Sequence, residues 1–245
     1  MFKDAALKEH VPTAVIHQPE YWPWVGFFHK VLYCDTLVIL DHVPSRKRSN
    51  ITRNLIRTEE GTMHLTIPVN AEFGQKINEV TTVEPRSWQQ NHYDNIRRFY
   101  SKTTGFRRFS GVLERYYKEH VHADLLEADV SALLVAFKLL GLEPKIILSS
   151  TLDPVGRKED MLIDILKKIG INRYLSGTGL LSYADVNKFK EAGIELRIQE
   201  FEHPTYRQQW EPFISGLSAL DFIMNTGDRA GEIIRLLRPA FQDGR

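Results

Sequence analysis

The chain has 245 residues, of which 42% are hydrophobic and 26% charged, with 15 glycines and 11 prolines. These proportions are those of ordinary globular proteins, and they exclude a disordered chain, a collagen or a coiled coil. The single cysteine, Cys34, cannot form an internal disulfide bond, and the first residues lack the apolar core of a signal peptide. No window approaches the roughly 18 apolar residues of a membrane span. We therefore expect a cytoplasmic protein with no membrane span.

The net charge of +1 hides an uneven distribution. Residues 46–118 contain 14 Lys and Arg against 7 Asp and Glu, so the rest of the chain has an excess of negative charge. Such a basic region is either a solvated surface or a surface that binds an anion. Nucleic-acid binding is the least favoured interpretation, because the whole chain is nearly neutral and contains no nucleic-acid-binding motif.

The first part of the chain predicts strands and one helix. Residues 13–16 form a short apolar run typical of a strand, and residues 24–32 have the pattern of a helix. Residues 36–40 are an uninterrupted β-branched and leucine run, which predicts a strand buried on both faces. Residues 64–69 predict a third strand, and Pro68 suits an edge or the end of a strand better than the centre of a sheet because it cannot donate a ladder hydrogen bond.

The middle of the chain changes to a helical period. Apolar residues recur at spacings of three and four, which predicts about three helices within residues 87–141. The last of them spans residues 125–140, with Asp124 as its N-cap and Gly141 as the residue that ends it. The aromatic side chains of this block are interpreted as core residues.

After Pro144 strands and helices alternate. The predicted strands are 145–148, 174–175 and 194–198, and the predicted helices are 157–169, 184–192, 217–225 and 229–237. Strands separated by single helices indicate right-handed βαβ units. We therefore predict a single α/β domain over residues 1–245, with a mostly parallel sheet, flanking helices and a helical subdomain at 87–141.

Four polar clusters follow predicted strands, and they begin at His17, Asp41, Ser149 and Ser176. Ligands of open parallel sheets bind at the carboxyl ends of the strands. Each cluster alone is ordinary turn chemistry, but their meeting at one edge favours a binding site. The basic segment 46–54 has no carboxylate, and its arginines suit a phosphate or carboxylate ligand.

Several other kinds of site find no support. Gly177-x-Gly179 lacks the rest of a dinucleotide fingerprint, and the chain has no Walker sequence and no Gly-x-Ser-x-Gly elbow. His120 and His122 point apart if they lie on a helix, so no metal site is predicted. No cofactor can be identified from the sequence.

The residues Ile16 to Lys30 read Ile-His-Gln-Pro-Glu-Tyr-Trp-Pro-Trp-Val-Gly-Phe-Phe-His-Lys. They resemble the signature Gln-Pro-x-Tyr-x-Pro-[Trp/Tyr]-x-Gly-[Tyr/Phe]-Phe of the WbqC-like protein family. The resemblance continues in chain order at Asp35, Asp41, Arg53-Asn54, 65–69, Ser149-Ser150, 174–179, 203–208 and 217–227. The chain has His42 where the family often has a second aspartate, and Thr226 where it commonly has a cysteine.

The resemblance implies a bacterial cytoplasmic protein of surface-polysaccharide biosynthesis, O-antigen (lipopolysaccharide) in particular. The most coherent hypothesis is a transferase that moves an acyl or aminoacyl group onto an amino-sugar nucleotide. Its catalytic base would be Asp41, His17 or His203. Its substrate-binding residues would be Gln18, Tyr21, Trp24, Gly26, Arg46, Lys47, Arg53, Asn54, Ser149, Ser150, Ser176, Gly177, Gly179, Tyr206, Gln208, Asp221 and Asn225.

Two alternatives stay open. A non-catalytic accessory protein that binds a nucleotide sugar would have the same binding residues, and only turnover would distinguish it from a transferase. The strand–loop–helix at the N-terminus, with Ser149-Ser150-Thr151 before a later helix, also resembles nucleotidyltransferases of the HUP superfamily. The paired histidines of their phosphate motif are absent, which argues against nucleotidyl transfer.

Overall fold

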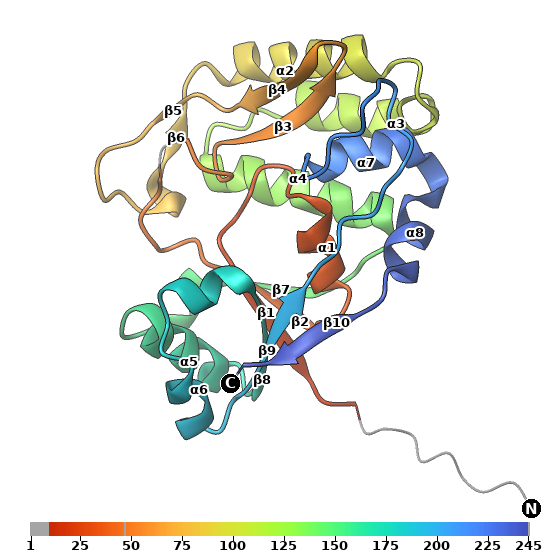
Figure 1. Ribbon diagram of the computed structural model, residues 1–245. Helices are drawn as coiled ribbons and strands as arrows, with labels where there is room; N and C mark the ends of the chain where they lie inside the picture. The colour runs from red at the N-terminus through yellow and green to blue at the C-terminus, as the bar shows by residue number, and fades with distance from the viewer. Residues whose placement is uncertain (1–9, 47, 245) are drawn as a thin grey trace, which may run out of the picture.

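The computed structural model describes residues 10–46 and 48–244, and its centre is a six-stranded sheet (Figure 1). From one edge to the other the strand order is β7-β2-β1-β8-β9-β10. The first five strands are parallel, and β10 pairs antiparallel with β9. The predicted α/β fold with a mostly parallel sheet is confirmed. The strands are β1 (Thr13–His17), β2 (Thr36–Ile39), β7 (Lys145–Leu148), β8 (Arg173–Gly177), β9 (Glu195–Glu200) and β10 (Ala240–Asp243).

Helices cover both faces of this sheet (Figure 1). On one face, α5 (Lys158–Lys168) and α6 (Asn187–Glu191) pack on side chains such as Ile16 and Val38. On the other face, α1 (Val25–Val31) packs on the alternate side chains, including Val15 and Leu37. β1 and β2 are buried on both sides for this reason, which explains their uninterrupted apolar runs.

A helical layer lies beyond α1. The predicted central helices are confirmed as α2 (Pro85–Tyr100), α3 (Thr104–Glu114) and α4 (Leu125–Leu140), with a π-helix over Arg115–Glu119. The C-terminal helices α7 (Ala219–Thr226) and α8 (Ala230–Leu236) pack among them, and their buried residues form one core with those of α1. The division into a domain and a helical subdomain stays a prediction.

The ends of α4 follow the predicted capping positions in part. Gly141 adopts the left-handed conformation with a φ of 64°, which ends the helix at a position where a side chain would be strained. Asp124 occupies the N-cap position, but its side chain makes no capping hydrogen bond. No helix of the described residues is both long enough and apolar enough to cross a bilayer.

The predicted strand at 64–69 is divided between two elements. Its first half belongs to β4 (Gly61–Thr66), which forms a separate hairpin with β3 (Arg53–Thr58). Pro68 then separates β4 from β5 (Val69–Asn70), which pairs with β6 (Thr81–Thr82). β3 and β10 were not predicted, because their polar-rich sequences show no strand pattern and depend on a partner strand. The remaining short elements are 3-10 helices at Ile77–Glu79, Ser149–Leu152, Thr178–Ser182 and Gly227–Arg229.

Candidate functional site

The strand order of the sheet reverses between β1 and β8. The chain moves outward from β1 to β2 and β7, and it then returns to build β8 and β9 on the other side of β1. At such a switch point the connections leave in opposite directions, so a crevice opens at the carboxyl ends of the strands. A cavity of about 750 Å³ lies at this place, and we call it the switch-point cavity.

Six of the predicted binding and catalytic residues line the switch-point cavity. β1 contributes His17 and the next residue Gln18, and β8 contributes Ser176 and Gly177. Gly179 lies in the 3-10 helix that follows β8, and Arg46 lies in the loop between β2 and β3. The first turn of α5, the segment after β2 and the 3-10 helix Thr178–Ser182 supply the apolar wall, which includes Leu40, Val43, Met161, Leu162 and Leu180.

The lining of the switch-point cavity is positively charged. It contains Lys30, Arg46 and Lys158, and no aspartate or glutamate. Arg46 and Lys158 are exposed, whereas Lys30 is 5% exposed. None of the three forms an ion pair with a carboxylate of residues 10–46 or 48–244. Unpaired cations beside an apolar wall suit a ligand with both an anionic and an apolar part.

His17 lies in this cavity as an uncharged imidazole. Its Nδ1 lies 2.9 Å from the carbonyl oxygen of Gln18, which can only accept, so Nδ1 carries the hydrogen and Nε2 has a free lone pair. Burial, and secondly the charge of Lys30, lower the pKa of His17 to about 3. His17 is therefore uncharged at neutral pH, and its Nε2 can accept a hydrogen bond from a ligand without first losing a proton.

Lys30 and Glu20 are charged groups that the sequence did not single out. Lys30 lies in α1, whose seven residues are all buried. Burial lowers the pKa of Lys30 to about 8, although Glu20 acts in the opposite direction. Burial likewise raises the pKa of Glu20 to about 7, and its Oε2 has no hydrogen-bond partner. A lysine within an otherwise apolar helix was the one available signal in the sequence.

Asp41 lies beside this cavity, where the ends of β2 and β7 meet. Its carboxylate accepts hydrogen bonds from the hydroxyl of Ser149 at 2.9 Å and from the backbone N–H and hydroxyl of Ser150 at 2.8 and 2.5 Å. Burial alone would raise the pKa of Asp41, but these hydrogen bonds outweigh it and lower the pKa overall. Because the Ser149 hydroxyl donates to Asp41, Nδ1 of His42 donates to the oxygen of the same hydroxyl, at 2.6 Å. The predicted cluster of Asp41 with the two serines is thus brought together, as an ionised carboxylate surrounded by donors.

Four other predicted binding residues form a network around α7, outside the lining of the switch-point cavity. The fully buried Asp221 accepts hydrogen bonds from the hydroxyls of Tyr100 and Tyr206, both at 2.6 Å. The side-chain amides of Gln208 and Asn225 donate to the same carboxylate at 3.0 and 3.2 Å. These contacts tie the C-terminal segment to α2 and α7.

Residues of the opening signature mostly hold its loop in place. The hydroxyl of Tyr21 bonds to His92 and Tyr117, and the amide of Asn54 donates to the backbone oxygens of Tyr21 and Trp22. Trp24 packs so closely over Gly26 that a Cβ at Gly26 would lie 2.4 Å from the indole ring. None of Tyr21, Trp24, Gly26 and Asn54 lines the switch-point cavity.

The last candidates lie elsewhere or cannot be placed. His203 stacks on Trp24, and its Nδ1 lies 2.9 Å from the carbonyl oxygen of Pro204. Burial lowers the pKa of His203, and its Nε2 is buried without a partner. Arg53 begins β3 opposite Thr66. Lys47 lies outside the described residues.

The fold and the cavity define an α/β protein with a cavity lined by cations at the switch point of its sheet. The chain belongs to the WbqC-like protein family, whose model matches residues 18–233. It is 28% identical to the uncharacterized protein Rv1507c of Mycobacterium tuberculosis over 228 residues, which cover 91% of this chain and 97% of that protein. No solved structure matches the chain. Membership of the family suggests a role in polysaccharide biosynthesis and leaves the reaction open.

Proposed function

We propose that this protein is a transferase of surface-polysaccharide biosynthesis. It would bind a nucleotide-linked amino sugar in the switch-point cavity and transfer an acyl or aminoacyl group to the sugar amine. The observation that carries the proposal is the lining of the cavity, which has three cations and no carboxylate beside an apolar wall. A nucleotide sugar has the matching chemistry, because its diphosphate is anionic and its base is largely apolar.

The diphosphate would contact Arg46 and Lys158 at the exposed rim of the cavity. Backbone N–H groups of the turn after β8, at Gly177 and Gly179, offer further donors to the same anion. The apolar side chains of α5 and of the strand ends would cover the nucleoside. This arrangement directs the sugar toward the inner part of the cavity, where His17 and Gln18 lie.

The transfer itself needs an acceptor for the proton of the attacking amine. Among the three candidate bases, His17 lines the cavity, whereas Asp41 and His203 do not. The amine nitrogen would attack the carbonyl carbon of an activated acyl donor while its N–H donates a hydrogen bond to Nε2 of His17, and the leaving group of the donor would depart with the amine proton. Asp41 would contribute indirectly, by holding the turn of Ser149 and Ser150 through its hydrogen bonds.

Binding and turnover can be tested separately. Thermal unfolding is followed with nucleotide-linked amino sugars, the free sugars and the free nucleotides, and ligand at about 100 times its Kd adds about 2.7 kcal/mol. Acylation is then followed by mass spectrometry with acyl-coenzyme A and aminoacyl donors. We expect a shift with nucleotide sugars, its reduction in Arg46→Ala, and acylation that is lost in His17→Ala. Lys190→Ala, an exposed residue of α6, is the matched control and should behave like the wild type.

Other outcomes would change the proposal. A shift with nucleotide sugars but no acylation with any donor would favour the accessory protein that only binds. Transfer of a nucleotidyl group would favour the nucleotidyltransferase alternative. A shift with an oligonucleotide alone, which disappears as salt is raised, would indicate nucleic-acid binding. No shift with any nucleotide sugar would reject the proposed function.

A further inference from the structure

We propose that Lys30 is a nucleophilic amine, which forms an imine with the carbonyl carbon of a phosphorylated aldehyde or ketone bound in the switch-point cavity. The inference goes beyond the proposed transfer reaction and does not depend on it. It rests on the position of the amine, on the groups that surround it and on the cations at the rim of the cavity.

The position of Lys30 places its amine at the inner end of the cavity. Lys30 is 5% exposed but lines the cavity, and its Nζ would lie 3.9 Å from a Cβ placed on Gly177. The amine therefore points from α1 to the carboxyl end of β8. Because Gly177 has no side chain, the backbone there leaves room for a ligand beside Nζ.

The surroundings of Lys30 do not hold it in an ion pair. No hydrogen bond or ion pair of Nζ is found among residues 10–46 and 48–244. The titratable groups that act on it are Glu20 and Cys34, whose thiol stays uncharged because burial raises its pKa to about 12, and Lys30 in turn acts on His17. Asp129, a buried carboxyl group near Glu20, has two oxygens without partners, and burial raises its pKa well above the ordinary value.

An amine must be uncharged to react as a nucleophile. An ordinary lysine is uncharged in roughly 0.1% of molecules at pH 7.5. Burial lowers the pKa of Lys30 to about 8, which leaves it uncharged in roughly a quarter of molecules at that pH. Lys30 thus has a neutral fraction that is about 200 times larger than that of exposed lysines.

The two exposed cations supply the anchor for such a ligand. A phosphate on Arg46 and Lys158 would hold the ligand at the rim, and the apolar wall would cover its body. The lone pair of Nζ attacks the carbonyl carbon, and a proton passes from nitrogen to oxygen to give a carbinolamine. Loss of water then forms the imine, so the step needs neither an oxidant nor a reductant.

The test uses pyridoxal phosphate as a phosphorylated aldehyde and borohydride to reduce any imine to a stable amine. The labelled lysines are identified by peptide mass spectrometry, at pH 7.5 and with less probe than protein. We expect Lys30 to be labelled at least about tenfold more than the exposed lysines Lys138 and Lys190. Pyridoxal, which lacks the phosphate, should label Lys30 about fivefold less.

Matched variants sharpen the result. Lys30→Arg keeps the positive charge but removes the nucleophile, and it should abolish the main label. Lys190→Arg, at an exposed position of α6, should leave that label unchanged. Arg46→Ala and Lys158→Ala should each reduce labelling of Lys30 by pyridoxal phosphate and leave labelling by pyridoxal unchanged.

Two outcomes would overturn the inference. One is labelling spread over the exposed lysines with Lys30 no more reactive than they are. The other is strong labelling of Lys30 that does not depend on the phosphate of the probe. The wild-type measurement needs no variant to fold and no acyl donor, so it gives its answer even if the chain proves to have no transferase activity.

Discussion

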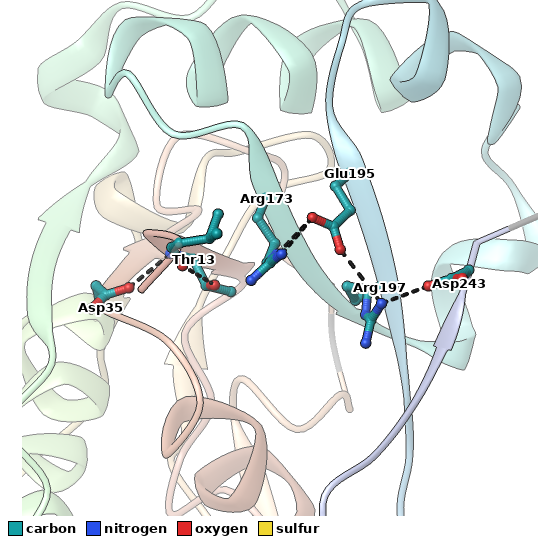
Figure 2. Close-up of polar contacts among 7 residues, drawn as sticks. Thr13, Asp35, Arg173, Glu195, Arg197 and Asp243 are labelled. Atoms are coloured by element: carbon teal, nitrogen blue, oxygen red, sulfur yellow. Dashed lines mark hydrogen bonds and ion pairs between the residues drawn. The ribbon is translucent and has the colours of Figure 1, made fainter. Parts of the chain in front are cut away.

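The amino end of the parallel sheet joins its charges in pairs, whereas the carboxyl end leaves its cations facing a cavity. At the amino end Arg173 contacts Glu195 at 2.7 Å and Arg197 contacts Asp243 at 2.6 Å (Figure 2). The backbone N–H of Thr13 donates to Asp35 at 2.8 Å in the same region (Figure 2). The two ion pairs join β8, β9 and β10, and the hydrogen bond joins β1 to the residue that precedes β2.

Cavity size does not distinguish the two ends. A hollow of about 720 Å³ lies at the amino end, against about 750 Å³ for the switch-point cavity. The hollow at the amino end is lined by Arg173 and Arg197, but both already contact carboxylates. A ligand there would compete with these pairs, whereas at the carboxyl end it would meet cations without partners. The pairing of charges, rather than volume, therefore identifies the candidate site.

The largest expected effect of a substitution is at the carboxyl end. Asp41→Ala removes a carboxylate that is 1% exposed and accepts hydrogen bonds from Ser149 and Ser150. We expect a loss of about 3–5 kcal/mol in the free energy of unfolding, measured with urea, because buried donors lose their acceptor. Asp41→Asn keeps one acceptor oxygen and should lose less. A loss below about 1 kcal/mol for the alanine variant would contradict the role given to this carboxylate.

The same carboxylate predicts a dependence on pH. The native pKa of Asp41 is lowered from its ordinary value, in spite of burial, by the hydrogen bonds from Ser150 and Ser149. Its stabilising contribution is therefore complete above the ordinary pKa of about 3.9 and is lost as the pH falls through the lower native value. The difference in stability between wild type and Asp41→Asn should accordingly shrink in acid.

Lys30→Met is expected to stabilise the protein, by about 1–3 kcal/mol at pH 7, because it removes a buried amine without an ion-pair partner. The native pKa of Lys30 is about 8, against an ordinary value of 10.5. Between these values the unfolded chain binds a proton that the folded chain has lost, so stability rises with pH. Urea denaturation at pH 7 and pH 10 should show this rise in the wild type only. A Lys30→Met variant that is less stable than the wild type at pH 7 would contradict this prediction.

Removal of the exposed cations Arg46 and Lys158 should weaken ligand binding and leave the stability of the protein nearly unchanged. Arg46→Ala and Lys158→Ala break no ion pair between described residues, so the free energy of unfolding should change by less than about 0.5 kcal/mol. Affinity for a nucleoside diphosphate, measured by calorimetry, should fall roughly fivefold for each variant, or about 1 kcal/mol. Unchanged affinity in both variants would place the anion elsewhere.

The smallest effect is expected at the amino end. Arg197→Ala breaks the contacts with Glu195 and Asp243, but these side chains are 36%, 42% and 69% exposed. Exposed ion pairs contribute less than about 1 kcal/mol, and salt screens them. The loss of stability should therefore be small at low ionic strength and vanish at about 1 M salt. A loss of stability as large as that expected for Asp41→Ala would contradict the difference proposed between the amino and carboxyl ends of the sheet.

The local sequence pattern was sufficient to predict the strands and helices that have a strong signal of their own. The apolar runs at 13–16 and 36–40 predicted β1 and β2, since a strand buried on both faces has no polar alternation. The helix at 125–140 was predicted with both of its ends, and its C-terminal glycine takes the expected backbone conformation. The strand β10 was not predicted, because it depends on hydrogen bonds with β9, about 40 residues earlier in the chain.

The candidate site likewise has a part that the sequence predicts and a part that only the tertiary structure decides. The position of His17, Asp41, Ser149 and Ser176 after strands was readable in the sequence, and a parallel sheet brings such positions to one edge. The pairing of β1 with β8 was not readable, because it depends on the order in which distant strands pack. That pairing brings His17 and Gln18 together with Ser176 and Gly177 in the switch-point cavity. It also places Lys30 beside Gly177, and the burial that lowers the pKa of this lysine exists only once α1 has packed against the sheet.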